Sequence, residues 1–287
     1  MSSASQARLA LMGITIIWGS TFSLTKMVLD ELPPFLYLTL RFALAALLML
    51  LFFAKSILPH WRATWRLSLP IGLALGIANL TQSSGINLTT ANKAGFYTSL
   101  SVVLVPLLQA LWFRTRPSKI ALGSATLALI GLACLSNILA ETPDFNLGDI
   151  LIFICAFMFA IHVLLFDRLP EHIPRTSIVA QQFLLTALIN LPMGLIYESW
   201  PADGLSWQVW GMVIFLAVGA TILAFSVLAW AQRHLSASNT ALILILEPVF
   251  AAGFSWIWLG ETLGLLGTIG AVIIIASLAV SSRETGY

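Results

Sequence analysis

The chain consists of long apolar runs separated by short breaks that are rich in charged residues, Pro and Gly. A transmembrane helix needs about 20 predominantly apolar residues, and the runs have this length. The pattern predicts an all-α polytopic membrane protein, a class whose partner is the lipid bilayer. We expect ten transmembrane helices, at 8–29, 33–54, 67–86, 92–113, 119–139, 148–167, 176–197, 207–231, 239–259 and 263–282.

The composition excludes a water-soluble enzyme or binding domain. Only 9% of the residues are charged and 59% are hydrophobic, whereas an ordinary soluble domain has about 25% charged residues. The net charge of +2 gives no reason to expect a nucleic-acid partner. Cys134 and Cys155 lack metal-site spacing, the four histidines are scattered, and no P-loop or G-x-S-x-G motif occurs. We therefore expect a protein with no cofactor, no metal and no enzymatic activity.

The basic residues set the expected orientation in the membrane. If the N-terminus lies inside, 11 of the 14 Lys and Arg residues fall in inner segments, as cytoplasmic loops require. The outer breaks instead carry acids, namely Asp30, Glu31, Glu141, Asp144, Glu198, Asp203 and Glu261. Both termini should therefore face the cytoplasm.

The two halves of the chain resemble each other. An offset of 147 residues aligns Leu88-Thr-Thr-Ala-Asn92-Lys-Ala94 with Leu235-Ser-Ala-Ser-Asn239-Thr-Ala241, and it also pairs Gly72 with Gly219. The alignment predicts two repeats, 1–140 and 147–287, with five helices each. An odd number of helices inverts the second repeat in the membrane. Inverted repeats are typical of secondary transporters, which bind substrate near the midplane between the halves.

Several short motifs resemble a known family. They are Trp18-Gly-Ser-Thr-Phe22 with Lys26, then Arg41-Phe42, Leu246-Glu247-Pro248 and Leu259-Gly-Glu261. In this order they resemble the drug/metabolite transporter superfamily, EamA branch, and the chain as a whole is most similar to the aromatic amino-acid exporter (YddG) type. The resemblance implies export of small metabolites across a bacterial inner membrane. It also implies a central cavity lined mainly by the first, third, fourth, sixth, eighth and ninth helices.

Polar side chains inside the spans are the candidate substrate ligands, because burying them in hydrocarbon is costly. Glu247 could hold an ammonium group or carry a proton, or it could be a structural acid beside the helix-perturbing proline that follows it. Asn79, Gln82 and Ser83 lie on one helix face and could bind polar substrate groups or join packed helices. Tyr97 and Ser101 share a face of the next helix in the same way.

Aromatic side chains would shape the rest of the pocket. Trp18, Phe22 and Trp230 are the candidates for contact with an apolar or aromatic substrate side chain. His162 could carry a proton, but a neutral, hydrogen-bonded histidine is the favoured interpretation. Lys26 and Arg41 are expected to snorkel toward the outer surface.

We therefore predict alternating-access export of amino acids, both aromatic and other neutral ones. The alternative is a multidrug or nucleotide-sugar carrier of the same superfamily. A nucleotide-sugar site should collect cations around the phosphates, and a carrier of cationic drugs should have an acid in each half, whereas Glu247 is unmatched. The driving ion and the oligomeric state stay open, with a monomer as one possibility.

Overall fold

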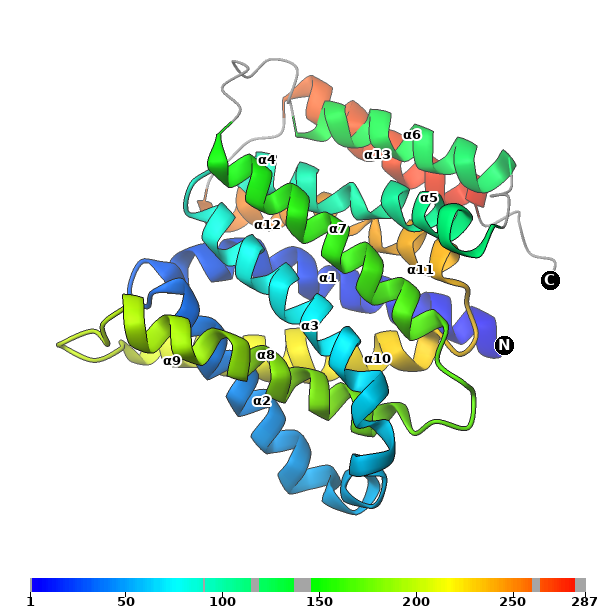
Figure 1. Ribbon diagram of the computed structural model, residues 1–287. Helices are drawn as coiled ribbons and strands as arrows, with labels where there is room; N and C mark the ends of the chain where they lie inside the picture. The colour runs from blue at the N-terminus through cyan, green and yellow to red at the C-terminus, as the bar shows by residue number, and fades with distance from the viewer. Residues whose placement is uncertain (1, 90, 115–118, 137–145, 260–263, 282–287) are drawn as a thin grey trace.

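The computed structural model describes residues 2–89, 91–114, 119–136, 146–259 and 264–281, and these residues form helices and connections without any strand. Figure 1 shows the helices as one bundle. The elements are α1 (Ser3–Leu29), α2 (Pro34–Ile57), η1 (Leu58–His60), α3 (Trp61–Ile86), α4 (Ala91–Ser99), α5 (Ser101–Phe113), α6 (Lys119–Leu135), α7 (Leu147–Asp167), α8 (Arg175–Tyr197), α9 (Trp207–Phe215), η2 (Leu216–Leu223), α10 (Ala224–Ala231), α11 (Ala237–Leu244), α12 (Glu247–Leu259) and α13 (Leu265–Ser281).

Several helices have the length and hydrophobicity of membrane spans, as the sequence predicts. In the described part of the chain, 7 helical stretches are long and apolar enough to cross a membrane, and Leu122–Leu135 and Leu265–Val280 are shorter apolar helices. One stretch, Pro34–Ile86, contains α2, η1 and α3, and Figure 1 shows the chain reversing direction at η1. The protein is a multi-pass membrane protein, and the count of ten spans stays a prediction.

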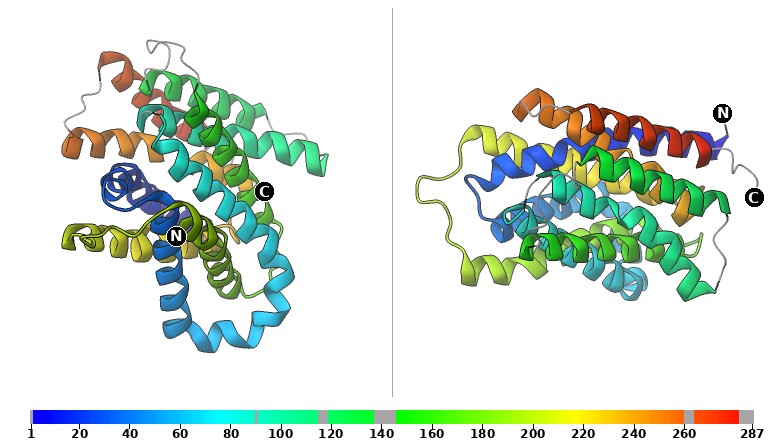
Figure 2. Two further views of the ribbon diagram at one scale, coloured as in Figure 1. Left: turned by 60° about the vertical axis from the view of Figure 1, so that its left-hand side comes forward. Right: turned by 90° about the horizontal axis from the view of Figure 1, so that it is seen from above.

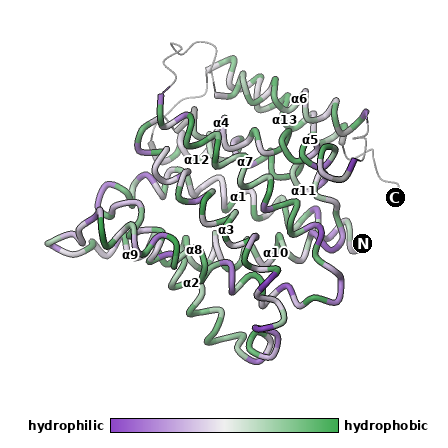
Figure 3. The backbone as a smooth tube through the Cα atoms, viewed as in Figure 1, coloured by the Kyte–Doolittle hydropathy of each residue, from purple (hydrophilic) through white to green (hydrophobic). Residues whose placement is uncertain are grey.

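Apolar side chains fill the interior of the bundle and also form much of its outer surface. Figure 3 shows hydrophobic residues along the helices and hydrophilic ones mainly at the connections. Many large apolar side chains are exposed, for example Phe52 at 76% and Trp207 at 79%. In water such surface would be unfavourable, but in a bilayer the lipid tails cover it.

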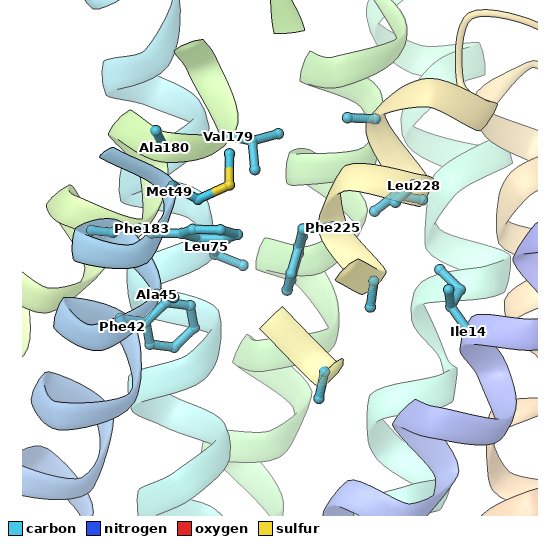
Figure 4. Packing of buried hydrophobic residues seen from close by; sticks show 14 of the residues in the cluster. Ile14, Phe42, Ala45, Met49, Leu75, Val179, Ala180, Phe183, Phe225 and Leu228 are labelled. Carbon is cyan, nitrogen blue, oxygen red and sulfur yellow. The ribbon is translucent and has the colours of Figure 1, made fainter. Parts of the chain in front are cut away.

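The helices pack in a defined set of neighbours. Helix α2 packs on α8, α3 packs on α7 and α8, and α1 packs on α10 and α12. Helices α6 and α13 lie against each other at one edge of the bundle (Figures 1 and 2). Figure 4 shows the packed core, in which Phe42, Phe183 and Leu75 from three helices meet near Phe225 of α10.

Turns divide two of the predicted helices, and a third changes from α-helical to π-helical geometry without a break. The range 92–113 is divided at Leu100 into α4 and α5, and 239–259 is divided at 245–246 into α11 and α12. Tight turns mark both places, since Leu100 N donates to Tyr97 O at 3.2 Å and Leu246 N donates to Ile243 O at 3.2 Å. The range 207–231 contains the π-helical segment η2.

Each of the three ranges still forms one helical stretch of membrane-spanning length, Ala94–Trp112, Ala237–Trp258 and Trp207–Ala231, so that the turns are local features within the expected spans. The physical cause at α12 is visible, because Pro248 has no N–H to donate to the preceding turn. Three further expectations lie outside the described residues: the polar loop at 141–144, the end of the first repeat at 140, and Glu261.

Candidate functional site

A cavity lies inside the bundle. Its volume is about 90 Å³, on a measure by which one water needs about 10–15 Å³. The lining comes from α2 as well as from the first, third, fourth, sixth, eighth and ninth expected helices. The lining residues are Trp18, Thr21, Phe22, Thr25, Arg41, Asn79, Gln82, Ser83, Ile86, Thr98, Ser99, Ser101, Val102, Val105, Phe159, His162, Val163, Phe225, Leu228, Ala241, Leu244 and Glu247.

One face of α3 gives the cavity a neutral polar wall. Asn79, Gln82 and Ser83 all line it, since residues three and four apart share a helix face. The Asn79 amide donates to Leu75 O at 3.0 Å within its own helix, and Gln82 Nε2 donates to Thr98 Oγ1 at 3.5 Å across to α4. The bond to Leu75 uses only the amide nitrogen of Asn79. Its oxygen, Oδ1, has no protein donor among the described residues and can accept a hydrogen bond from a solute.

The two helix breaks border the same cavity. Ser99 and Ser101 flank the break between α4 and α5, while Leu244 and Glu247 flank the break between α11 and α12. A helix break exposes backbone polar groups that would otherwise bond within the helix. In a membrane protein such irregular backbone occurs where it lines a cavity or is buried in protein, and here it coincides with a carboxylate and two hydroxyls.

Helix α1 passes close to Glu247. A Cβ on Gly19 would lie only 3.0 Å from Glu247 O and 2.6 Å from Phe250 Cβ, so that α1 and α12 touch through the glycine. This contact explains why α1 and α12 are close neighbours. It also holds Trp18, the residue before the glycine, at the cavity wall.

Aromatic rings form another part of the cavity wall. The Trp18 ring meets the Phe225 ring edge-on with centroids 5.4 Å apart, and Phe225 meets His162 at 5.7 Å. The Trp18 indole donates to Ala220 O of η2 at 2.9 Å. Edge-to-face contacts at these distances are favourable and hold the rings in place.

Two expected pocket residues lie elsewhere. Trp230 is 38% exposed and its ring packs on His234 at 5.3 Å. At about 100° per residue, it points away from the face of α10 that carries Phe225 and Leu228. Tyr97 packs edge-on against Phe96 at 5.3 Å and lies outside the cavity lining.

His162 has a specific partner. Its Nε2 lies 2.8 Å from Gln182 Oε1, and the side chain is 1% exposed. Because an amide oxygen only accepts, Nε2 carries a proton and donates. The bond to Gln182 is compatible with the hydrogen-bonded interpretation of His162, and the ring also borders the cavity, so that a role in carrying protons stays a prediction.

Three lining residues have roles that the sequence analysis missed. Arg41 was expected to snorkel, but it is 7% exposed and lines the cavity, whereas Lys26 is exposed. Phe225 and Phe159 were not singled out among the many phenylalanines.

The described residues contain no group of three or more His, Cys, Asp or Glu side chains that could hold a metal ion.

The chain is similar to known transporters over nearly its whole length. The model of the EamA-like transporter family matches residues 6–137 and 146–283. An uncharacterized transporter of Archaeoglobus fulgidus is 30% identical over 276 residues, covering 96% of this chain and 85% of the relative. A probable amino-acid metabolite efflux pump of Salmonella typhimurium is 27% identical, covering 93% of this chain and 92% of the relative.

A solved structure has the same fold. It is a crystal structure of a protein with a TM-score of 0.81 and 19% sequence identity, and the match covers 97% of both chains. This likeness concerns the fold alone. The family match extends over nearly the whole chain, and it identifies the protein as a member of the EamA-like transporter family, within the drug/metabolite transporter superfamily.

Proposed function

We propose that this transporter exports amino acids, both aromatic and other neutral ones, from the cytoplasm by alternating access through the cavity. The observation that carries the proposal is the position of the cavity at two helix breaks. With an offset of 147 residues, Leu100 corresponds to position 247, within two residues of the break at 245–246. Broken helices at corresponding positions of two halves are the best pointer to a transporter's substrate site.

The packing supports ten spans arranged as two inverted repeats, 1–140 and 147–287. In the two proposed repeats, α1 corresponds to α7, α2 to α8, α3 to α9–α10, and α6 to α13. The contacts can then be compared by replacing each helix with its counterpart in the other repeat. The contact of α3 with α7 then becomes the contact of α1 with α10, and the pairs α2–α8 and α6–α13 map onto themselves. The two ranges that the family model matches support the same division.

The distribution of charge supports an orientation with both termini in the cytoplasm. Figure 1 places the start of α1, the turn at η1 and the connections after α7 and α10 at one end of the bundle. Arg8, Arg62, Arg168 and Arg233 belong to this end, where cytoplasmic loops carry their basic residues. The other end has the acidic connections 30–33 and 198–206. We further propose a bacterial inner membrane as the location.

The chemistry of the lining supports an amino acid as substrate. Asn79, Gln82, Ser83 and Ser101 would bind the polar end, with Glu247 holding the ammonium group. Trp18, Phe22, Phe159 and Phe225 would contact the side chain through apolar and ring–ring contacts. Two relatives have names that include amino-acid metabolite efflux.

Counterflow in proteoliposomes tests the proposal. Vesicles are loaded with unlabelled phenylalanine, threonine, a nucleotide sugar or a lipophilic cation, and uptake of the labelled compound is followed. We expect accumulation with the amino acids alone. Exchange of the nucleotide sugar or the cation without exchange of amino acids would favour the multidrug or nucleotide-sugar alternative, and Arg41 in the lining makes the nucleotide-sugar arm a necessary one.

A further inference from the structure

Arg41 is a buried cation at the cavity wall. It lies seven residues after the start of α2 at Pro34 and is 7% exposed. Its Nε donates to Thr221 Oγ1 of η2 at 2.8 Å, and its Nη1 donates to Tyr37 Oη at 3.0 Å. These bonds fix the guanidinium between α2 and η2 and prevent it from snorkelling.

The charge of Arg41 has no carboxylate partner among the described residues. Both acceptors are neutral hydroxyl groups, and the remaining contact is the face of the Phe42 ring, 5.3 Å from Arg41 Cζ. A guanidinium has five N–H donors, so the two hydrogen bonds leave three donors unused. Nη2 has no hydrogen-bond partner among the described residues and is not fully buried, so that a solute in the cavity can reach it.

A cation without a counter-ion is costly at this depth in a membrane. The cost is reduced when an anion arrives in the cavity. Arg binds carboxylates strongly, because its planar fork matches both oxygens and charge-assisted hydrogen bonds are short and strong. The free donors of Arg41 therefore fit the carboxylate of a solute.

Glu247 and Arg41 both line the cavity. Glu247 is next to Gly19 through its backbone oxygen. Arg41 binds Thr221, whose neighbour Ala220 accepts the Trp18 indole hydrogen bond. A single solute in the cavity can thus meet a negative group from α12 and a positive group from α2.

We propose that Arg41 is the carboxylate anchor of a zwitterion site, in which Glu247 receives the α-ammonium group. The inference rests on the proposed function, and it adds that the transporter selects substrates by the pair of charges on the α-carbon. Decarboxylated amines and amino-acid amides are then poor substrates. The aromatic lining selects the side chain separately.

Competition in the counterflow assay tests this proposal. Labelled phenylalanine is exchanged in the presence of unlabelled phenylalanine, phenylethylamine, phenylalanine amide or 3-phenylpropionate. For the unmodified protein we expect each analogue that lacks one charge to compete at least about tenfold more weakly than phenylalanine, the effect of losing one charge-assisted contact.

Variants assign the discrimination to Arg41. Arg41→Gln should weaken phenylalanine binding about tenfold or more. The binding of phenylethylamine, measured as the exchange of labelled against unlabelled phenylethylamine, should not change, because this compound has no carboxylate. Lys26→Gln removes an exposed cation of α1 and should leave phenylalanine exchange unchanged. Thr221→Val removes the acceptor of Nε but keeps the charge, so that it should retain the preference for the carboxylate.

The outcomes separate the two proposals. If the unmodified protein exchanges none of the amino acids, the proposed function fails. If it exchanges phenylalanine but accepts phenylethylamine equally well, the function stands and the zwitterion site is refuted, whether or not the variants fold. An equal loss for both compounds in Arg41→Gln would show that Arg41 only holds α2 against η2.

Discussion

Gly19 is the point where a single methyl group should disturb the bundle most clearly. A Cβ at this position would lie 2.6 Å from Phe250 Cβ, 2.9 Å from Ala251 N and 3.0 Å from Glu247 O. Ordinary contacts between carbon atoms are about 3.5–4.0 Å. Two of the three neighbours are backbone atoms, so no side-chain rotation relieves the clash. Gly19→Ala therefore requires α1 and α12 to separate by about 1 Å.

The expected cost follows from overpacking, which destabilises a well-packed core by about 1–3 kcal/mol. Gly13→Ala is the matched control, because Gly13 lies on the same helix and a Cβ there meets nothing within 4 Å. Both variants gain the same helix propensity, up to about 1 kcal/mol. The difference between them then isolates the contact with α12.

The free energy of unfolding can be measured by SDS titration in bicelles, followed by circular dichroism, with counterflow measured in parallel. We expect Gly19→Ala to be about 1–3 kcal/mol less stable than Gly13→Ala. Phenylalanine counterflow should fall as well, because the shift displaces Glu247 from the cavity wall. Equal stability and equal transport of the two variants would refute the close packing of α1 on α12.

Three further predictions concern hydrogen bonds. Glu198 accepts hydrogen bonds from the backbone N–H groups of residues 35 and 36 at 3.0 and 2.8 Å, at the start of α2. Glu198→Gln should lower the free energy of unfolding by about 0.5–2 kcal/mol, which is the contribution of a helix N-cap. An effect no larger than that of Asp203→Asn, at an exposed site, would contradict this. Ser238 donates to Gln109 at 2.7 Å, linking α11 to α5; Ser238→Ala should cost about 0.5–1.5 kcal/mol in the same titration, and an unchanged midpoint would count against the link. Trp18→Phe keeps a ring but loses the indole donor, and it should cost about as much, whereas full stability would show that this bond contributes nothing.

Much of the helical architecture could be predicted from the sequence, because a run of about 20 apolar residues has few alternatives in a bilayer. The expected range 148–167 differs by one residue from α7 at Leu147–Asp167, and 176–197 likewise differs by one from α8 at Arg175–Tyr197. The helix breaks were not predicted. Pro248 accounts for the break before α12, but Pro106 lies inside the continuous helix α5 and no proline lies at Leu100, so proline alone does not locate the breaks.

The lining of the cavity shows the same limit. Asn79, Gln82 and Ser83 were found by their spacing, because α3 is a continuous α-helix through these residues and places them on one face. Phe225 follows η2, whose π-helical turns shift the phase of α10. Trp230 was expected in the pocket from an undisturbed helix, and the structure turns it outward.

Arg41 was misplaced for a different reason. Its position near the outer end of a span favours snorkelling when the helix is considered alone. The hydroxyl groups that hold it come from Tyr37 on its own helix and from Thr221, 180 residues away in the chain. A partner at that separation is a tertiary contact, and no spacing rule within one helix predicts it.

The most direct test of the account is substrate protection of a cysteine in the cavity. Ser101 lines the cavity beside the break of α4 and α5, and Ser101→Cys can be made together with Cys134→Ala, since Cys155 is fully buried. The purified variant, shown to retain counterflow, is labelled with a maleimide with and without phenylalanine, and Asp203→Cys at an exposed site is the control. We expect phenylalanine to slow labelling at position 101 several-fold and to leave position 203 unchanged. Labelling at position 101 that is equally fast with saturating phenylalanine would contradict binding in this cavity.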